Sequence, residues 1–312
     1  MKTITLIVPC YNEQESINLF YETVEKVFNS MNQEKENYRP DYLFVNDGSS
    51  DNTLSVLHEL NQKDPENVHL ISFSRNFGKE SAIAAGLRNA HGDFVALMDV
   101  DLQDPPELLP QMLKIIETEN YDCVGCVQTS RKQNPVRAFL SSSFYHVIDY
   151  LSSVNIKPNV RDYRLMSRQY VDAVNDLTEY NRFSKGIFSW IGFDTKYIEY
   201  KGRDRAAGET HWSLFQLLDY SIEGIIDFSD APLKLATLVG IISCICAVIG
   251  IIFITIRALI FGGAVAGWPS LVSIMLLIGG LQLFCLGILG KYIGKVYLET
   301  KHRPQYIIKE HK

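Results

Sequence analysis

Cysteine is scarce in this sequence, and positive charge is not in excess. Six cysteines in 312 residues are too few for a disulfide-stapled scaffold, so a reduced compartment is expected. The formal net charge is −6, and residues 233–312 hold eight basic and two acidic side chains, which leaves −12 for residues 1–232. An acidic first part lacks the basic face of nucleic-acid-binding proteins, so we expect no nucleic-acid partner. Disorder is also excluded, because 46% of the residues are hydrophobic.

Charge is missing altogether from two long segments near the C-terminus. Residues 235–256 and residues 271–289 contain no charged side chain. As helices they would reach roughly 33 Å and roughly 28 Å, which matches the hydrocarbon core of a bilayer. The alternative, two buried helices of a soluble core, is disfavoured because such helices rarely lack charge for so long. The sequence therefore predicts two transmembrane helices within residues 233–291. Residues 1–8 are expected to form a strand, not a signal peptide, because Pro9 and polar residues follow them.

Most basic residues near the predicted hairpin lie on one side of it. The loop between the two spans, residues 258–270, carries no charge, and only Arg257 sits at its edge. Lys234 precedes the first span, and Lys291, Lys295, Lys301 and Arg303 follow the second. By the positive-inside rule, this asymmetry places residues 1–232 and both termini in the cytoplasm.

The remaining sequence divides around this hairpin. Residues 1–210 are expected to form a cytoplasmic globular domain, and residues 292–312 a basic cytoplasmic tail. In residues 211–232, apolar side chains recur at helical spacing and acidic ones lie on another face. This juxtamembrane helix either packs on the globular domain or lies at the membrane surface.

Strand-like and helix-like segments alternate through the first part of the chain. The expected strands are residues 4–8, 42–45, 69–73, 94–98 and 122–127, and the expected helices are residues 15–31, 53–61 and 79–90. This order is typical of an α/β domain with a mostly parallel, Rossmann-like sheet. Polar residues follow the first four strands. Ligands of such sheets bind beyond the carboxyl ends of the strands, so these polar residues predict a site there.

Two carboxylates separated by one residue, Asp99 and Asp101, follow the expected strand at residues 94–98. They can direct oxygen ligands at one hard cation, which takes its other ligands from water and substrate phosphates. Such a cation would offset the charge on a departing diphosphate. An Asp-x-Asp pair alone is more often a solvated loop. Its place at a strand end opposite Asp47, before Gln-Asp-Pro-Pro-Glu, favours a cation site.

Four motifs occur in order along the chain: Val-Pro-Cys-Tyr-Asn-Glu at residues 8–13, Val-Asn-Asp-Gly-Ser-Ser-Asp at 45–51, Ser-Arg-Asn-Phe-Gly-Lys-Glu at 74–80 and Asp-Val-Asp-Leu-Gln-Asp-Pro-Pro-Glu at 99–107. Together they resemble glycosyltransferase family 2. More narrowly, they resemble its polyprenyl-phosphate glycosyltransferases, which include the dolichol-phosphate mannosyltransferases and the bactoprenol glucosyltransferases. The resemblance covers nearly the whole chain, since bacterial members also carry two C-terminal spans. It implies a GT-A fold, a nucleotide-sugar donor, a divalent cation (Mg²⁺ or Mn²⁺) and inversion at the anomeric carbon.

The resemblance also implies roles for residues on the donor side. The expected nucleotide-sugar-binding residues are Pro9, Tyr11, Glu13, Asp47, Lys79, Asp99, Arg205 and His211, of which Asp47 would contact the base or ribose. The cation and the diphosphate are expected at Asp99, Asp101 and Gln103. His211 departs from the family, where a Lys often follows Gly-Glu-Ser/Thr, and a neutral imidazole supplies less positive charge to a diphosphate.

On the acceptor side, the resemblance places the lipid phosphate at Arg131 and Arg137, and Asp162 near the reacting sugar as a catalytic residue together with Asp101. A polyprenyl phosphate oxygen is already anionic near neutral pH, so Asp162 is expected to orient the acceptor or the surroundings of the cation, with proton removal as a second role. The simpler alternatives are a solvated basic run at Arg131 and Arg137, and an ion-paired surface acid at Asp162. Cys123 and Cys126 are expected to be structural, because no second Cys/His pair follows them.

The predicted activity is inverting, non-processive transfer of glucose or GlcNAc from a UDP-linked donor to undecaprenyl phosphate, for modification of a cell-envelope glycan. The alternatives are a mannosyltransferase that uses GDP-mannose, a processive polysaccharide synthase and a catalytically silent membrane scaffold. No Trp follows an Arg, so the Gln-x-x-Arg-Trp motif of processive synthases is absent. The intact Asp-x-Asp pair disfavours the scaffold. The sequence leaves open the sugar and whether the chain forms a homo-oligomer.

Overall fold

A computed structural model describes residues 1–33, 38–129, 157, 160–201, 229, 231–261 and 267–312 of the chain. Its globular part contains an eight-stranded sheet in the order β7-β5-β6-β4-β1-β2-β3-β8. The strands are β1 (Lys2–Cys10), β2 (Tyr38–Asn46), β3 (Val68–Phe73), β4 (Phe94–Leu97), β5 (Cys123–Gln128), β6 (Val160–Ser167), β7 (Thr195–Tyr200) and β8 (Ile308–His311). The β3-β2-β1-β4 part is parallel, whereas β6 and β8 pair antiparallel with their neighbours.

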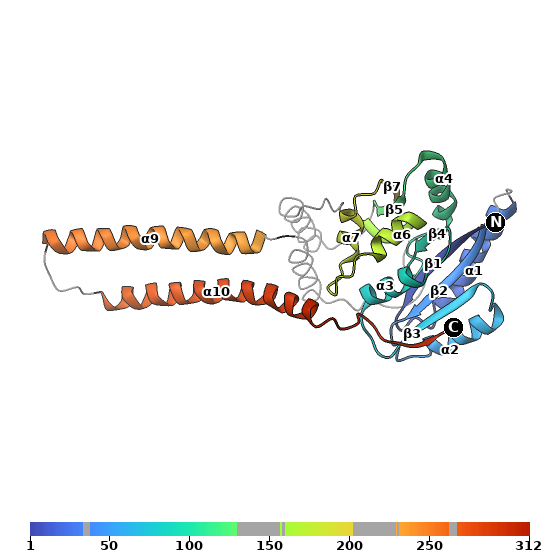
Figure 1. Cartoon of the computed structure of the whole chain (residues 1–312), viewed down its shortest axis with the longest axis horizontal. Helices are drawn as coiled ribbons and strands as arrows, with labels where there is room; N and C mark the ends of the chain where they lie inside the picture. Colours follow the sequence, from blue (N-terminus) through green and yellow to red (C-terminus); the bar gives the residue numbers. More distant parts are fainter. Residues whose placement is uncertain (34–37, 130–156, 158–159, 202–228, 230, 262–266) are drawn as a thin grey trace.

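Helices cover both faces of the sheet (Figure 1). The helices of the globular part are α1 (Ile17–Gln33), α2 (Thr53–Lys63), α3 (Lys79–Asn89), a short 3-10 helix η1 (Pro106–Leu108), α4 (Leu109–Glu119), α6 (Arg168–Asn175) and α7 (Ser184–Trp190). Apolar side chains of α1, α2 and α4 pack with one face of the sheet, and those of α3, α6 and α7 with the other. In β1, Leu6 and Val8 pack on the face covered by α1, α2 and α4, and Ile7 packs on the opposite face. This is expected for a central strand buried on both sides.

The predicted α/β fold is confirmed, and the predicted strands and helices lie within one or two residues of β1–β5 and α1–α3 at most ends. The observed strands β1 and β2 are longer than predicted, because their ladder continues from Lys2↔Tyr38 to Cys10↔Asn46. Sequence patterns alone predict no strand at β6, β7 or β8. Cys123 and Cys126 are buried in β5 as free thiols, in agreement with a structural role.

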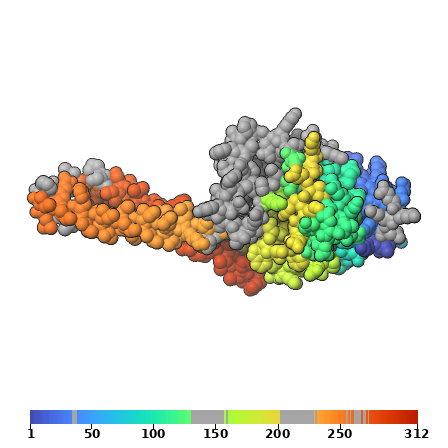
Figure 2. Space-filling view, turned by 90° about the horizontal axis from the view of Figure 1, so that it is seen from above, coloured from blue at the N-terminus to red at the C-terminus, as the bar shows by residue number. Residues whose placement is uncertain are grey.

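Two long apolar helices, α9 (Ala231–Phe261) and α10 (Trp268–Thr300), project together from one end of the globular part (Figures 1 and 2). Both are long and apolar enough to cross a membrane, and in the most apolar stretch of each helix no side chain is buried by the protein. They are therefore candidate membrane spans. Both helices run beyond the predicted spans of residues 235–256 and 271–289. The predicted juxtamembrane helix at residues 211–232 lies almost wholly outside the described residues.

The C-terminal residues differ from the predicted basic tail. Helix α10 continues to Thr300, and β8 then adds an antiparallel strand to the edge of the sheet beside β3. The backbone groups of Leu70 and Lys312 exchange hydrogen bonds of 2.8 Å and 2.9 Å. An unpaired edge strand offers free N–H and C=O groups, and β8 satisfies those of β3. The last residues of the chain are thus part of the globular domain.

The turn after β2 depends on Gly48, whose φ is +63°. A Cβ atom there would lie 2.3 Å from the backbone carbonyl carbon of Arg75. We expect Gly48→Ala to cost about 2–4 kcal/mol, from the left-handed backbone and the clash together. Its matched control is Gly192→Ala, where φ is +74° but the space is open, so that only about 1 kcal/mol of backbone strain applies.

Thermal unfolding of the detergent-solubilised protein measures both variants. At roughly 2–4 °C per kcal/mol, Gly48→Ala should lower Tm by about 5–15 °C and Gly192→Ala by only a few degrees. Equal shifts for the two variants would show that the close approach of the two loops is unimportant.

Candidate functional site

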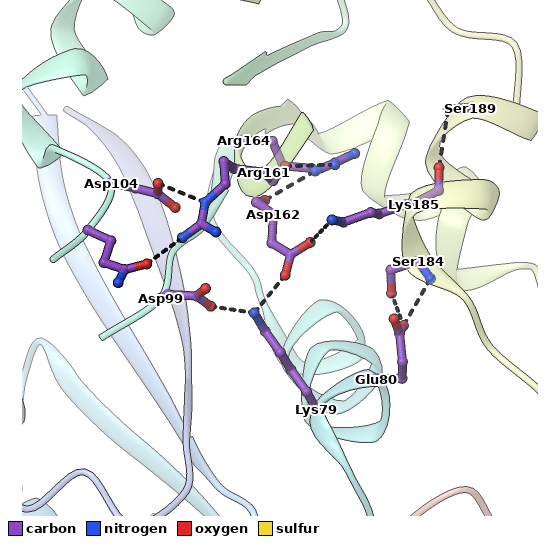
Figure 3. A network of polar contacts seen from close by, with 11 residues as sticks. Lys79, Glu80, Asp99, Asp104, Arg161, Asp162, Arg164, Ser184, Lys185 and Ser189 are labelled. Carbon is purple, nitrogen blue, oxygen red and sulfur yellow. Dashed lines mark hydrogen bonds and ion pairs between the residues drawn. The ribbon is translucent and has the colours of Figure 1, made fainter. Parts of the chain in front are cut away.

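Charged side chains meet in one network of polar contacts near the carboxyl ends of the parallel strands (Figure 3). Asp47 follows β2, Lys79 begins α3, and Asp99 follows β4. The antiparallel pairing of β4 with β6 includes Leu97↔Arg164, and its continuation by two residues brings Asp99 opposite Asp162. The structure thus places Asp47 and Asp99 at the ends of parallel strands and brings Lys79 and Asp162 to Asp99, and the roles of these residues in binding or catalysis stay predictions.

The centre of the site is the ammonium group of Lys79, which lies between two carboxylates. Lys79 Nζ is 2.7 Å from Asp99 Oδ1 and 2.6 Å from Asp162 Oδ2. Burial by itself would lower the pKa of Lys79, but Asp162 and Asp99 outweigh it and hold that pKa above its usual value. Lys79 is consequently a fixed positive charge.

Asp162 is paired with a second ammonium group, since Lys185 Nζ lies 4.0 Å from its Oδ1 atom. Its side chain is only 19% exposed. Burial favours the neutral acid, but Lys79 and Lys185 outweigh burial and keep the pKa of Asp162 below its usual range. Asp162 is therefore ionised at neutral pH and is a weak base. Its position agrees with the predicted orienting role better than with proton removal.

Asp47 holds the loop that precedes α3. Its Oδ1 accepts the backbone N–H of Phe77 at 2.6 Å, and its Oδ2 accepts that of Gly78 at 2.9 Å. Burial raises the pKa of Asp47, and the two N–H groups and Arg75 oppose this shift. Both carboxylate oxygens thus fix the start of the helix that carries Lys79. A contact of Asp47 with the base or ribose of a nucleotide stays a prediction.

The loop after β4 is ordered by its own acidic and amide side chains. Asp101 is buried, and its Oδ1 accepts the backbone N–H of Gln103 at 3.1 Å. The guanidinium of Arg161 donates to Gln103 Oε1 at 3.0 Å and to Asp104 Oδ1 at 3.1 Å. The Tyr200 hydroxyl donates to the same oxygen of Asp104. Arg161 therefore ties β6 to the loop that carries the Asp-x-Asp pair.

This loop offers oxygen donors of the kind that Mg²⁺ and Mn²⁺ prefer, the carboxylates of Asp99 and Asp101 and the amide oxygen of Gln103. Within the described ranges, no three His, Cys, Asp or Glu side chains are grouped as a protein-only metal cage. The donor set fits a hard cation that is held by one or two carboxylates and completes its shell with water and substrate phosphates.

The loops after β1 and β2 are joined by hydrogen bonds that bring the predicted nucleoside residues to the same edge. The backbone N–H of Asn12 donates to Ser49 Oγ at 3.0 Å, and that of Glu13 to Thr53 Oγ1 at 2.9 Å. Pro9 lies near the end of β1, and the ring of Tyr11 is 48% exposed beside these loops. Their contacts with a nucleoside stay predictions.

Sequence reasoning missed a second polar contact beside the site. Glu80 follows Lys79 on α3 and accepts hydrogen bonds from the backbone N–H of Ser184, at 2.9 Å, and from its hydroxyl. Burial raises the pKa of Glu80, while Ser184 opposes the shift. No local pattern marks Ser184 or Lys185, which reach the site through tertiary packing alone. Four predicted site residues lie outside the described residues: Arg131, Arg137, Arg205 and His211.

Comparisons with known proteins show what the chain is similar to. Residues 5–178 match glycosyl transferase family 2. The chain is 41% identical over 310 residues to the bactoprenol glucosyl transferase of Shigella phage SfV, and the match covers 99% of each chain. It is 40% identical over 307 residues to a prophage bactoprenol glucosyl transferase homolog of Escherichia coli K12, and that match covers 98% of each chain.

Similar solved structures include the glucosyl-3-phosphoglycerate synthase of Mycobacterium tuberculosis in complex with Mn²⁺, UDP and glucosyl-3-phosphoglycerate. It is 16% identical to this chain, with a TM-score of 0.49, and the match covers 72% of this chain and 78% of the synthase.

Because Lys79 forms ion pairs with both Asp99 and Asp162, we expect the stability of the folded protein to depend on pH. Because Asp162 has a depressed pKa in the folded state, its contribution is present above about pH 4 and is lost as the pH falls through the folded pKa. We expect Lys79→Met to lower the stability by about 1–2 kcal/mol at pH 7, since it leaves Asp99 and Asp162 facing each other without a cation. That deficit should shrink as the pH falls below about 4, where protonation removes the repulsion.

The measurement is Tm across a pH series for the wild type, Lys79→Met and the control Lys185→Met. The control removes a more distant ammonium, at 4.0 Å from Asp162, and should cost less. A Lys79→Met deficit that does not change with pH would contradict the assigned ion pairs.

Proposed function

We propose that this chain, which belongs to glycosyl transferase family 2, transfers glucose from UDP-glucose to bactoprenol phosphate, with inversion at the anomeric carbon. One observation carries this proposal. The similarity to bactoprenol glucosyl transferases extends over nearly the whole chain, including both α9 and α10 as well as the sheet and its loops. The polar site and the two apolar helices are what a transferase needs for one water-soluble and one lipid substrate.

On the donor side, we assign the nucleoside to the loops joined after β1 and β2, where Pro9, Tyr11 and Glu13 lie. The exposed ring of Tyr11 suits contact with a base. The diphosphate is assigned to the loop after β4, with Arg205 and His211 as further contacts. Asp99, Asp101 and Gln103 would hold Mg²⁺ or Mn²⁺, which would supply charge neutralisation for the departing nucleoside diphosphate. The fixed charge of Lys79 adds positive potential beside Asp99.

On the acceptor side, the attacking phosphate oxygen already carries charge, because the second pKa of a phosphate monoester is about 6. The reaction then needs orientation and electrostatic support more than a strong base. Asp162 fits that need, since Lys79 and Lys185 keep it ionised and fixed in place. The lipid phosphate is assigned to Arg131 and Arg137.

The membrane arrangement follows from the substrates. We infer that α9 and α10 cross the bacterial plasma membrane and that the sheet domain and both termini lie in the cytoplasm, where nucleotide sugars are made. The basic residues near the globular ends of both helices support this orientation. Residues 211–232 would lie at the membrane surface and bring the site close to the lipid phosphate.

The direct test incubates purified protein with undecaprenyl phosphate in vesicles, Mg²⁺ or Mn²⁺, and UDP-glucose, UDP-GlcNAc or GDP-mannose in parallel. Mass spectrometry of the lipid should show one added hexose with UDP-glucose only. Asp101→Ala should reduce turnover at least about 100-fold. Asp172→Asn is the matched control, because Asp172 is a 64% exposed surface partner of Arg168. Near-wild-type turnover in EDTA would refute the cation, and a lipid product from another sugar would refute the donor.

The topology has its own test. In a background without the native cysteines, a single Cys at Ala264 should react with an impermeant thiol reagent in intact cells. A Cys at Lys309, which is exposed on β8, should react only after lysis. Labelling of the Lys309 site from outside would place the site on the face of the membrane that lacks the donor.

A further inference from the structure

Helix α10 is fastened to the globular domain at its cytoplasmic end by Glu299, the only acidic residue of that helix. Glu299 Oε1 accepts the backbone N–H groups of Tyr180 at 2.9 Å and Asn181 at 3.1 Å. It also accepts the side-chain amide of Asn181 at 3.3 Å. Hydrogen bonds to an ionised acceptor are stronger than neutral ones, so this carboxylate holds the segment before α7 firmly on α10.

The segment that Glu299 holds leads directly into the site. Phe183 is buried, and Ser184, the first residue of α7, donates twice to Glu80. Lys185 then reaches Asp162 (Figure 3). Lys185, whose ammonium lies beside Asp162, is only four positions after Asn181, whose amide is bound by Glu299. A displacement of Asn181 would therefore be passed to both Ser184 and Lys185.

Residues that follow α10 restrain the same helix end further. We define residues 301–312 as the C-terminal strap. The side-chain amide of Gln305 donates to the backbone carbonyl of Glu179, and the backbone carbonyl of Gln305 accepts the Ser81 hydroxyl at 3.2 Å. The ring of Tyr306 stacks on that of Phe73 with centroids 5.0 Å apart. The end of α10 is thus joined both to the segment before α7 and to α3.

We propose that Glu299 is a positioning residue for the transfer reaction: it fixes residues 180–185 to α10 and thereby sets where Lys185 and Asp162 lie relative to the membrane helix. The inference rests on the proposed function, because the acceptor phosphate is then held at the membrane surface while the sugar is held by the sheet domain. The two must meet at a reactive distance, and a misplacement of about 1 Å can cost about 100-fold in rate.

The experiment compares Glu299→Ala and Glu299→Gln in vesicles that contain undecaprenyl phosphate. Glu299→Ala should lower kcat about 10-fold with an unchanged KM for the nucleotide sugar, since the donor site is not touched. Glu299→Gln keeps an oxygen acceptor for the same N–H groups and should restore most of the rate. The matched control is Glu310→Ala, which removes a carboxylate of the C-terminal strap. Glu310 pairs with His58 and Lys312 and not with residues 180–185.

A double-mutant cycle shows whether the effect passes through Lys185. Lys185→Ala should lower kcat on its own, and adding Glu299→Ala should lower it by less than a further 2-fold, because both changes displace the same contact. Amide hydrogen exchange supplies a readout that is independent of activity. In Glu299→Ala, a peptide covering residues 179–190 should exchange faster than in the wild type and in Glu310→Ala.

The outcomes separate the two proposals. A wild-type protein that transfers no sugar overturns the proposed function and this inference with it. An active wild type with Glu299→Ala equal to it overturns the inference alone. So do fully additive losses in the cycle, or a loss of kcat without faster exchange in residues 179–190.

Discussion

The site depends on the placement of one ammonium group, that of Lys79, between the carboxylates of Asp99 and Asp162. Without a cation there, two carboxylates brought together by the β4/β6 register would repel each other. The protein secures Lys79 by placing it at the first position of α3 and by fixing the preceding loop through both oxygens of Asp47. The packing of Gly48 against that loop completes the arrangement. Residues from four separate segments therefore support a single contact.

Contacts of the neighbouring residues link the sheet domain to the apolar helices. Lys79 and Glu80 stand at the start of α3, and the start of α7 reaches both Glu80 and Asp162. The segment before α7 is bound by Glu299 at the end of α10. A hairpin joined to the domain only by a flexible linker would leave the distance between the site and α10 undefined. Here hydrogen bonds and an added β-strand define it.

Sequence reasoning located the parts of the site that lie at the ends of consecutive strands. Asp99, Asp101 and Asp47 follow apolar runs of strand length, so the parallel α/β pattern alone predicts that they share one edge. It could not find Lys185 or Ser184, because no local pattern marks them and their contacts with the site come from tertiary packing of α7. Nor could it predict β8, since four residues with two charges read as a tail until an edge strand offers them backbone partners. The commitment of both Asp47 oxygens to backbone amides was equally invisible, because it depends on a close approach of two loops.

On the proposed function, an ionised Asp162, held by Lys79, supports transfer of glucose to bactoprenol phosphate. Asp162→Asn tests it most directly, because the amide keeps the size of the side chain and removes its charge. The measurement is the initial rate of glucosyl-lipid formation in vesicles, with donor binding determined separately by calorimetry. We expect a rate about 100-fold below that of the wild type, with donor affinity retained. A variant that forms the glucosyl lipid at the wild-type rate would contradict it.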